Sequence, residues 1–243
     1  MPNQLKVCLS PDLFHLYADR SSQVVVTDVL RATTTMCLAL SSHVAKIKPV
    51  MTVEEALEFR DNPNYILAAE RNGNIVKGFD FGNSPQPFIN ANHNNKNMVM
   101  TTTNGTRMIN IAKADHEVAV GGFVNHKAIH NWLIDQEKDL IICCSGWKGK
   151  FCLEDTLFAG ALAKSLLESG AFTMNCDSAR AAINLYNQAE SDMYAFLETS
   201  SHRQRLGKLN IDTDVEISLT KDMVNLVPVL KDDFLSAEFV ELS

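Results

Sequence analysis

The sequence lacks the features that mark several common protein classes. It has no apolar run long enough to span a bilayer, and its N-terminus has no apolar signal-peptide core, so we expect a cytoplasmic protein without a membrane partner. It also lacks an excess of basic residues. The formal net charge is -7, which argues against a nucleic-acid partner because phosphate backbones attract basic surfaces.

The six cysteines lack the spacing of a known site. None forms a CxxC pair and most lie in apolar runs, which predicts buried free thiols rather than disulfides or a zinc site. The GxxxxGK[ST] phosphate-binding loop is absent as well. With 46% hydrophobic and 21% charged residues, the composition is that of an ordinary globular protein.

What the sequence does contain is an alternation of short β-branched runs with helical patterns. The predicted strands are 24–28, 44–48, 65–69, 98–102, 117–121 and 140–144, and the predicted helices are 32–41, 52–61, 105–112, 124–135 and 153–169. Several strands are continuously apolar, as strands covered on both faces are. We therefore expect an α/β fold in which helices flank a mixed, largely parallel sheet. Residues 1–243 form a single domain on this prediction, with two lobes around one cleft as an open alternative.

The last third of the chain has a different pattern. It predicts one long helix over 178–197, a short helix over 201–207 and a closing strand over 224–230. Pro228 cannot donate a hydrogen bond to a neighbouring strand, so we expect this strand at an edge of the sheet.

Polar residues gather at a first predicted strand-to-helix junction, and open α/β sheets bind ligands at such junctions. Asp28 ends an apolar strand, and Arg31, Thr33 and Thr34 open the helix that follows. Free N–H groups and hydroxyls at a helix start can hold phosphate oxygens, and Arg31 can add a bidentate contact. The alternative is a capped helix with an Asp28–Arg31 ion pair. Consecutive β-branched threonines are poor helix formers, which favours a functional role.

A second junction repeats this pattern. It contains Thr103, Asn104, Gly105, Thr106 and Arg107, which together suit an anion cradle. Two such junctions can face each other across one cleft. The alternative is that both arginines pair with acids on the protein surface.

Four further acids lie at junctions or in loops. Glu70 follows a strand, Asp80 lies in a glycine-rich loop, and Glu154 with Asp155 opens a helix. Carboxylates in such places can converge on one cation. The alternatives are a hairpin tip for Glu70, a turn for Asp80 and favourable helix-dipole charges for the last two.

Taken in order, these segments resemble the 2-phosphosulfolactate phosphatase family. The matching stretches are 28–35, 70–73, 78–85, 101–107, 153–156 with 159–160, and a tail of Ser201-His202, Arg205-Leu206 and 212–215. The resemblance implies an α/β fold and Mg²⁺-dependent hydrolysis of 2-phospho-3-sulfolactate to 3-sulfolactate and phosphate, as in coenzyme M biosynthesis. Trp147 and Lys150 depart from the loop that we expect, which leaves the precise substrate open.

We therefore expect a phosphoric monoester hydrolase that acts on a small anionic phosphate ester with Mg²⁺. The candidate catalytic residues are Asp28, Arg31, Glu154 and Asp155; the candidate substrate ligands are Arg31, Thr33, Thr34, Thr103, Asn104, Gly105, Thr106 and Arg107; the candidate metal ligands are Asp28, Glu70 and Asp80, with Glu154 and Asp155 in reserve. A non-catalytic binding domain for a phosphorylated or sulfonated metabolite is the first alternative, and a transferase is the second. The oligomeric state is left open, a homo-oligomer included.

Two other phosphatase mechanisms are disfavoured by single residues. An aspartyl-phosphate scheme of the haloacid-dehalogenase type needs a second acid two residues after Asp28, where Leu30 stands. A cysteine nucleophile at Cys144 needs an arginine to hold phosphate at the end of its loop, where Lys150 stands.

Overall fold

The computed structural model describes residues 1–19, 21–71, 74–206 and 212–241. Its strands are β1 Asn3–Cys8, β2 Gln23–Thr27, β3 Ile47–Pro49, β4 Tyr65–Arg71, β5 Asn74–Ile75, β6 Asn97–Thr101, β7 Val118–Val120, β8 Leu140–Cys144, β9 Phe172–Met174, β10 Leu226–Lys231 and β11 Phe234–Phe239. The α-helices are α1 Phe14–Tyr17, α2 Ala32–Ser41, α3 Val53–Leu57, α4 Gly105–Ala112, α5 His126–Gln136, α6 Leu153–Glu168, α7 Asp177–Ala189, α8 Met193–Leu197, α9 Ser201–Leu206 and α10 Asp212–Leu219. The 3₁₀ turns are η1 Pro11–Leu13, η2 Gln86–Phe88 and η3 Phe123–Asn125.

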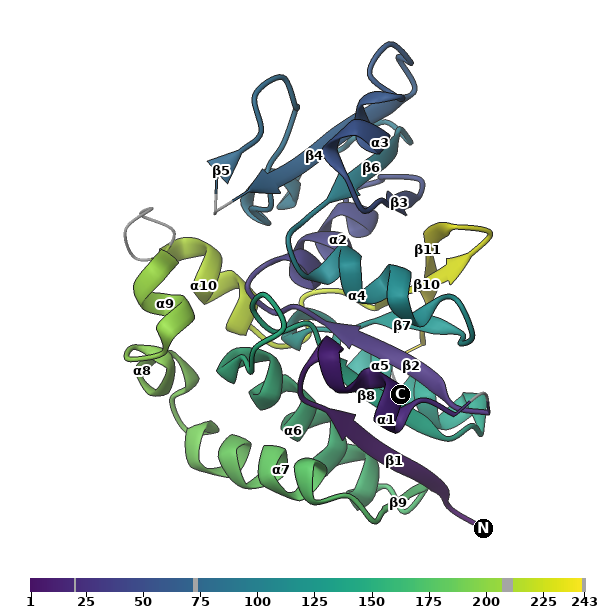
Figure 1. The fold of residues 1–243 in the computed structure, drawn as a ribbon, viewed down its shortest axis with the longest axis vertical. Coiled ribbons are helices and arrows are strands. Elements are labelled where there is room, and N and C mark those ends of the chain that lie inside the picture. The colour runs from purple at the N-terminus through teal and green to yellow at the C-terminus, as the bar shows by residue number, and fades with distance from the viewer. Residues whose placement is uncertain (20, 72–73, 207–211, 242–243) are drawn as a thin grey trace.

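The described strands form one sheet in the order β5-β4-β6-β3-β11-β10-β7-β2-β8-β1-β9. Strands β4, β6 and β3 are parallel to one another, and so are β7, β2, β8, β1 and β9. The β10–β11 hairpin pairs antiparallel with β7 on one side and β3 on the other, so it joins the two parallel groups. In Figure 1 one group lies in the upper half of the molecule and the other in the lower half. The predicted α/β class with a mixed, largely parallel sheet is confirmed.

Helices cover both faces of the central strands, which explains their continuous apolar sequence. Successive side chains of a strand point to opposite faces. Val25 of β2 packs into the cluster formed with α5, α6 and α7, whereas Val24 and Val26 pack with α2 and α4. All five residues of β2 are buried, as are all five of β8.

The last third of the chain corrects two predictions. Residues 178–197 do not form one helix, because α7 ends at Ala189 and Asp192 starts α8 by accepting a hydrogen bond from the Ala195 N–H at 2.9 Å. The edge position expected for the strand at 224–230 is also wrong, since β10 lies inside the sheet. Strand β10 pairs with β7 through one pair of residues, Val229 with Ala119. The missing N–H of Pro228 therefore removes little of the hydrogen bonding between these two strands.

The short helix predicted over 201–207 is observed as α9, and Gly207 lies outside the described residues. Asn72 and Gly73, which predict a hairpin turn, lie outside them too, although the flanking strands β4 and β5 pair antiparallel. Among the described helices, none has both the length and the apolar composition that crossing a membrane requires.

Candidate active site

The site begins with Asp28, which follows the buried strand β2 and lies 6% exposed. Its backbone N–H donates to Thr33 Oγ1 at 3.1 Å, and its carbonyl accepts from the Thr33 N–H at 3.0 Å. Its carboxylate accepts from the Ala32 N–H at 3.4 Å, at the start of α2. The loop therefore holds the Asp28 carboxylate against the free N–H groups of a helix start.

The second junction packs directly against this loop. A Cβ at Gly105, the first residue of α4, would lie 2.9 Å from Asp28 Oδ2 and 2.8 Å from the Cβ of Ala32. Glycine is required here because any other side chain would displace the carboxylate or the helix start. The two strand-to-helix junctions, which belong to different halves of the sheet, thus meet at Asp28.

Two further carboxylates act on Asp28. Burial raises the pKa of Asp28 to about 6, and the charges of Glu70 at the end of β4 and Glu154 on α6 add to this rise. The charge of His202 and the Ala32 N–H oppose it. Glu70 and Glu154 are themselves 6% and 0% exposed. Glu70 and Glu154, predicted from separate motifs, therefore lie close enough to Asp28 for their charges to repel its carboxylate.

Glu154 is held by a histidine from α9. Its Oε1 shares a hydrogen bond with His202 Nδ1. Burial alone would raise the pKa of Glu154, but the hydrogen bond and charge of His202 lower it on balance. The His202 ring in turn lies against the Trp147 ring, with 5.6 Å between the ring centres.

Asp155 has a different role from its neighbour Glu154. One carboxylate oxygen accepts from the Val29 N–H at 2.9 Å and the other from the Gly146 N–H at 3.0 Å. Burial raises the pKa of Asp155 well above its ordinary value, and the charges of Asp28 and Glu154 raise it further. Asp155 therefore ties the loops after β2 and β8 to the start of α6.

The threonines predicted to bind substrate are engaged with the backbone. Thr34 Oγ1 donates to the Val29 carbonyl at 3.0 Å, and Thr106 Oγ1 donates to the Thr102 carbonyl at 3.1 Å. Thr33 accepts from Asp28 as described, and Thr33, Thr34 and Thr106 are fully buried. They shape the two junctions, and their contact with a substrate stays a prediction.

The two arginines lie in different environments. Arg31 is buried and pairs with Asp214 of α10, whose other oxygen accepts from Ser84 Oγ at 2.8 Å and Gln86 Nε2 at 2.7 Å. The Arg107 side chain is 41% exposed and pairs at 3.2 Å with the exposed carboxylate of Asp12. Arg107 thus forms the surface ion pair that the sequence leaves open as the alternative, whereas Arg31 does not.

The remaining predicted residues are Thr103 and Asn104 of the second junction, and Asp80. Thr103 Oγ1 donates to Glu70 Oε2 at 3.5 Å. Asn104 is buried and accepts from the Lys148 N–H at 3.0 Å, which links the second junction to the loop after β8. Asp80 is exposed, and its carboxylate accepts from the Leu67 N–H at 2.8 Å, so it ties its loop to strand β4.

A nucleophilic Cys144 is not favoured by the geometry. The thiol is fully buried at the end of β8, and burial raises its pKa well above the ordinary value. Reactive cysteines instead have lowered pKa values and some exposure to solvent.

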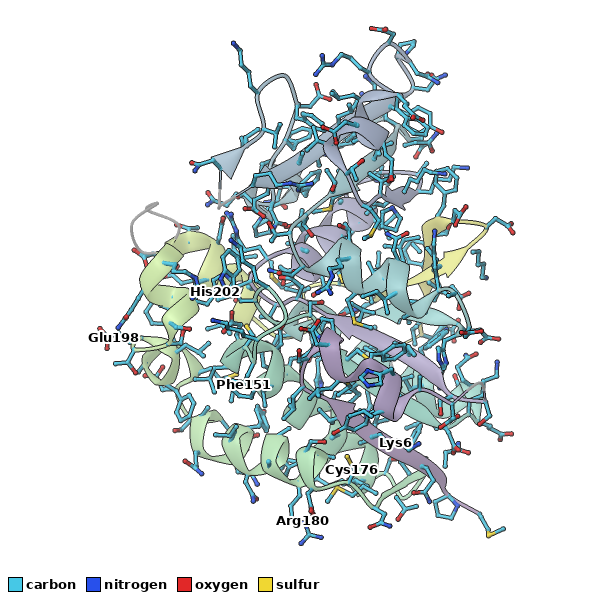
Figure 2. All side chains as sticks on the ribbon, viewed as in Figure 1. Lys6, Phe151, Cys176, Arg180, Glu198 and His202 are labelled. Carbon is cyan, nitrogen blue, oxygen red and sulfur yellow. The ribbon has the colours of Figure 1, made fainter. Side chains whose placement is uncertain are left out.

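A cavity of about 210 Å³ opens beside Glu154 and His202. Its lining includes Trp147, Phe151, Ser201 and Arg205. The Arg205 guanidinium lies 4.5 Å from the centre of the Trp147 ring. Figure 2 shows His202 on α9 and Phe151 on the loop before α6 on the same side of the molecule.

The sequence reading assigned no role to His202, Arg205, Trp147 or Asp214. Ser201-His202, Arg205 and 212–215 belong to the stretches that carry the family resemblance. His202 lies far along the chain from Glu154, and Asp214 lies far from Arg31, so no local spacing marks either as a partner.

A family model for 2-phosphosulpholactate phosphatase matches residues 8–233 of the chain. The chain belongs to this family. A probable 2-phosphosulfolactate phosphatase of Thermotoga petrophila is 38% identical over 216 residues, which make up 88% of this chain and 92% of the relative. A protein of the same name from Caldanaerobacter subterraneus is 35% identical over 215 residues, 87% of this chain and 89% of the relative. Membership in the 2-phosphosulpholactate phosphatase family confirms the predicted enzyme class, a phosphoric monoester hydrolase.

The resemblance to this family implies Mg²⁺, and the carboxylates fit a hard divalent cation. Asp28, Glu70 and Glu154 are buried, and the charges of Glu70 and Glu154 repel that of Asp28, which a bound cation would relieve. Glu154 Oε2 is also buried without a hydrogen bond of normal geometry from the described residues. Asp80, by contrast, uses its carboxylate to hold a backbone N–H.

The raised pKa of Asp28 predicts a pH dependence of stability in Mg²⁺-free buffer. The folded protein binds a proton at Asp28 up to about pH 6, whereas the unfolded chain releases it near its ordinary pKa of about 4. The free energy of unfolding should therefore fall, relative to the D28N variant, by about 3 kcal/mol as the pH rises from about 4 to about 7. Urea unfolding of both proteins with EDTA at several pH values measures this. Parallel pH profiles for the two proteins would contradict it.

Proposed function

We propose that the chain is an Mg²⁺-dependent phosphatase that hydrolyses the phosphate monoester of a 2-hydroxy acid, with 2-phospho-3-sulfolactate as the expected substrate. The observation that carries the proposal is the convergence of Asp28, Glu70 and Glu154 where the two junctions meet. Family membership supports it, since curated relatives are named for this activity. The role in coenzyme M biosynthesis follows from the named substrate and is part of the same proposal.

One or two of Asp28, Glu70 and Glu154 would bind Mg²⁺ directly and the rest through water, because Mg²⁺ prefers oxygen ligands and takes one or two protein carboxylates together with water. Asp80 is left out of this set because it is exposed and bonded to the Leu67 N–H. When bound, the ion would neutralise the charge of the phosphoryl oxygens. Asp155 acts as a positioning residue, since its two backbone bonds fix Val29 beside Asp28 and Gly146 in the facing loop.

His202 is the proposed proton donor to the leaving oxygen of the substrate. Its Nδ1 is bonded to Glu154, which orients the ring and leaves Nε2 for a proton transfer. The ring lines the cavity beside Glu154, where a small phosphate ester has room to bind. Donation of this proton would stabilise the alkoxide that forms when the phosphorus–oxygen bond breaks.

Cationic and neutral donors surround the acids. The expected substrate carries phosphate, carboxylate and sulfonate, so one Mg²⁺ cannot balance its charge. Arg31 would supply a planar pair of donors from the first junction, and Arg205 lines the cavity beside Glu154. Gly105 lets the backbone of the second junction come close to the bound anion.

The activity prediction concerns turnover and its metal requirement. Purified protein should release phosphate from 2-phospho-3-sulfolactate or a related 2-phosphohydroxy acid with Mg²⁺ present, and EDTA should abolish the release. Phosphate release over such a panel, with and without EDTA, is the measurement. Tight binding of these esters without turnover would instead establish the alternative of a binding domain, and a strict need for an acceptor substrate would establish a transferase.

A second prediction separates the two arginines. Arg31→Lys keeps the charge beside Asp214 but loses the planar donors, so kcat/KM should fall about a hundredfold, on the order of 2–4 kcal/mol of transition-state binding. Arg107→Lys is the matched control. It changes only an exposed ion pair, worth about 1 kcal/mol or less, so kcat/KM should change less than about fivefold.

The comparison uses steady-state kinetics together with thermal melts of both variants. A folded Arg31→Lys variant that retains near-full activity would remove Arg31 from the site. An equal loss of kcat/KM in both variants would show that the difference in exposure between the two arginines does not decide which of them acts on the substrate.

A further inference from the structure

Three different metal-ligating side chains come together at the start of α6. Cys152, Glu154 and His202 each offer one ligand atom, and these atoms lie within 4.8 Å of one another. All three residues are buried, with 6%, 0% and 8% exposure. A thiol, a carboxylate and an imidazole held this close in the protein interior form the donor set of a transition-metal site.

The local fold explains why the three side chains meet. Cys152 is the residue before α6 and Glu154 lies in its first turn, so both face the same loop. His202 lies on α9. Its Nδ1 bonds to Glu154, and its ring packs against the ring of Trp147 from the loop after β8. Cys152 and His202 are far apart in the sequence, which is why cysteine spacing alone predicts no zinc site.

Glu154 provides the second observation. Its Oε1 is engaged with His202, whereas its Oε2 is buried without a hydrogen bond of normal geometry from the described residues, although the Cys152 thiol lies near enough to lower the pKa of Glu154. A buried polar atom without a partner costs free energy, which coordination to a cation would remove. The lining of the adjacent cavity includes all three residues, so an ion has room beside them.

We propose that Cys152, Glu154 and His202 bind a thiophilic divalent transition metal, of which Zn²⁺ is the type. Sulfur and imidazole ligands favour Zn²⁺ over Mg²⁺, which takes oxygen ligands. Three protein ligands would leave a fourth position for water or another ligand, and the cavity lined by Trp147 and Arg205 adjoins the three side chains. The ion would use Glu154 and His202, so it would also compete with the proposed phosphatase chemistry.

Binding of this ion does not depend on the proposed phosphatase activity, so it is tested without substrate. Co²⁺ is titrated into the metal-free protein in buffer with excess Mg²⁺, and the thiolate-to-cobalt charge-transfer absorption is recorded. One equivalent of Co²⁺ should produce the band, and Zn²⁺ should displace it, because Zn²⁺ binds such sites more tightly than Co²⁺.

Two cysteine variants identify the thiol that binds the metal ion. Cys152→Ser should abolish the band and weaken Zn²⁺ binding at least tenfold. Cys176→Ser is the matched control, since Cys176 is half-buried and lies far from His202 in Figure 2; this variant should keep the band. Circular dichroism and melting curves verify that each variant is folded.

His202→Gln keeps the thiol and removes the imidazole, so it should retain a sulfur band but bind Zn²⁺ at least tenfold more weakly. This variant decides the question if Cys152→Ser does not fold. A band that survives Cys152→Ser, a band that is lost in Cys176→Ser, unchanged Zn²⁺ affinity in His202→Gln, or no thiolate band at all would each overturn the proposal.

Discussion

The close packing of Gly105 against Asp28 is the contact on which the rest of the site depends. It brings the start of α4, from one half of the sheet, onto the loop that follows β2 in the other half. The acids at the ends of β4 and β2 and at the start of α6 thereby share one buried region. Such a region is unfavourable for folding unless charge partners or a cation offset the repulsion.

The last third of the chain supplies most of these partners. His202 of α9 bonds to Glu154 and lowers its pKa against the effect of burial, and Asp214 of α10 pairs with the buried Arg31. The backbone contributes through Asp155, whose two oxygens accept N–H bonds from separate loops. The C-terminal helices are therefore part of the site rather than an appendage, because they neutralise charges that the α/β core places together.

Local patterns in the sequence predicted the α/β class, the helices α2 and α4 to the residue, and the positions of Asp28, Glu70 and Glu154 at strand ends and a helix start. These predictions succeed because strand ends and helix starts are local features. The break before α8 and the interior place of β10 could not be predicted, since the first rests on the Asp192 cap and the second on which strands β10 meets. The roles of His202 and of the exposed Arg107 were equally out of reach, because each depends on a partner distant in the chain.

The central claim is that the buried acids are held together to bind a divalent cation. Its most direct test is the number of protons released when Mg²⁺ binds, obtained by calorimetry in buffers of different ionisation enthalpy. Asp28 has a pKa of about 6 without metal and must ionise to act as a ligand, so roughly half a proton should leave per Mg²⁺ at about pH 6 and almost none at about pH 8. Mg²⁺ binding with the same proton release at both pH values, or no binding at all, would contradict the account.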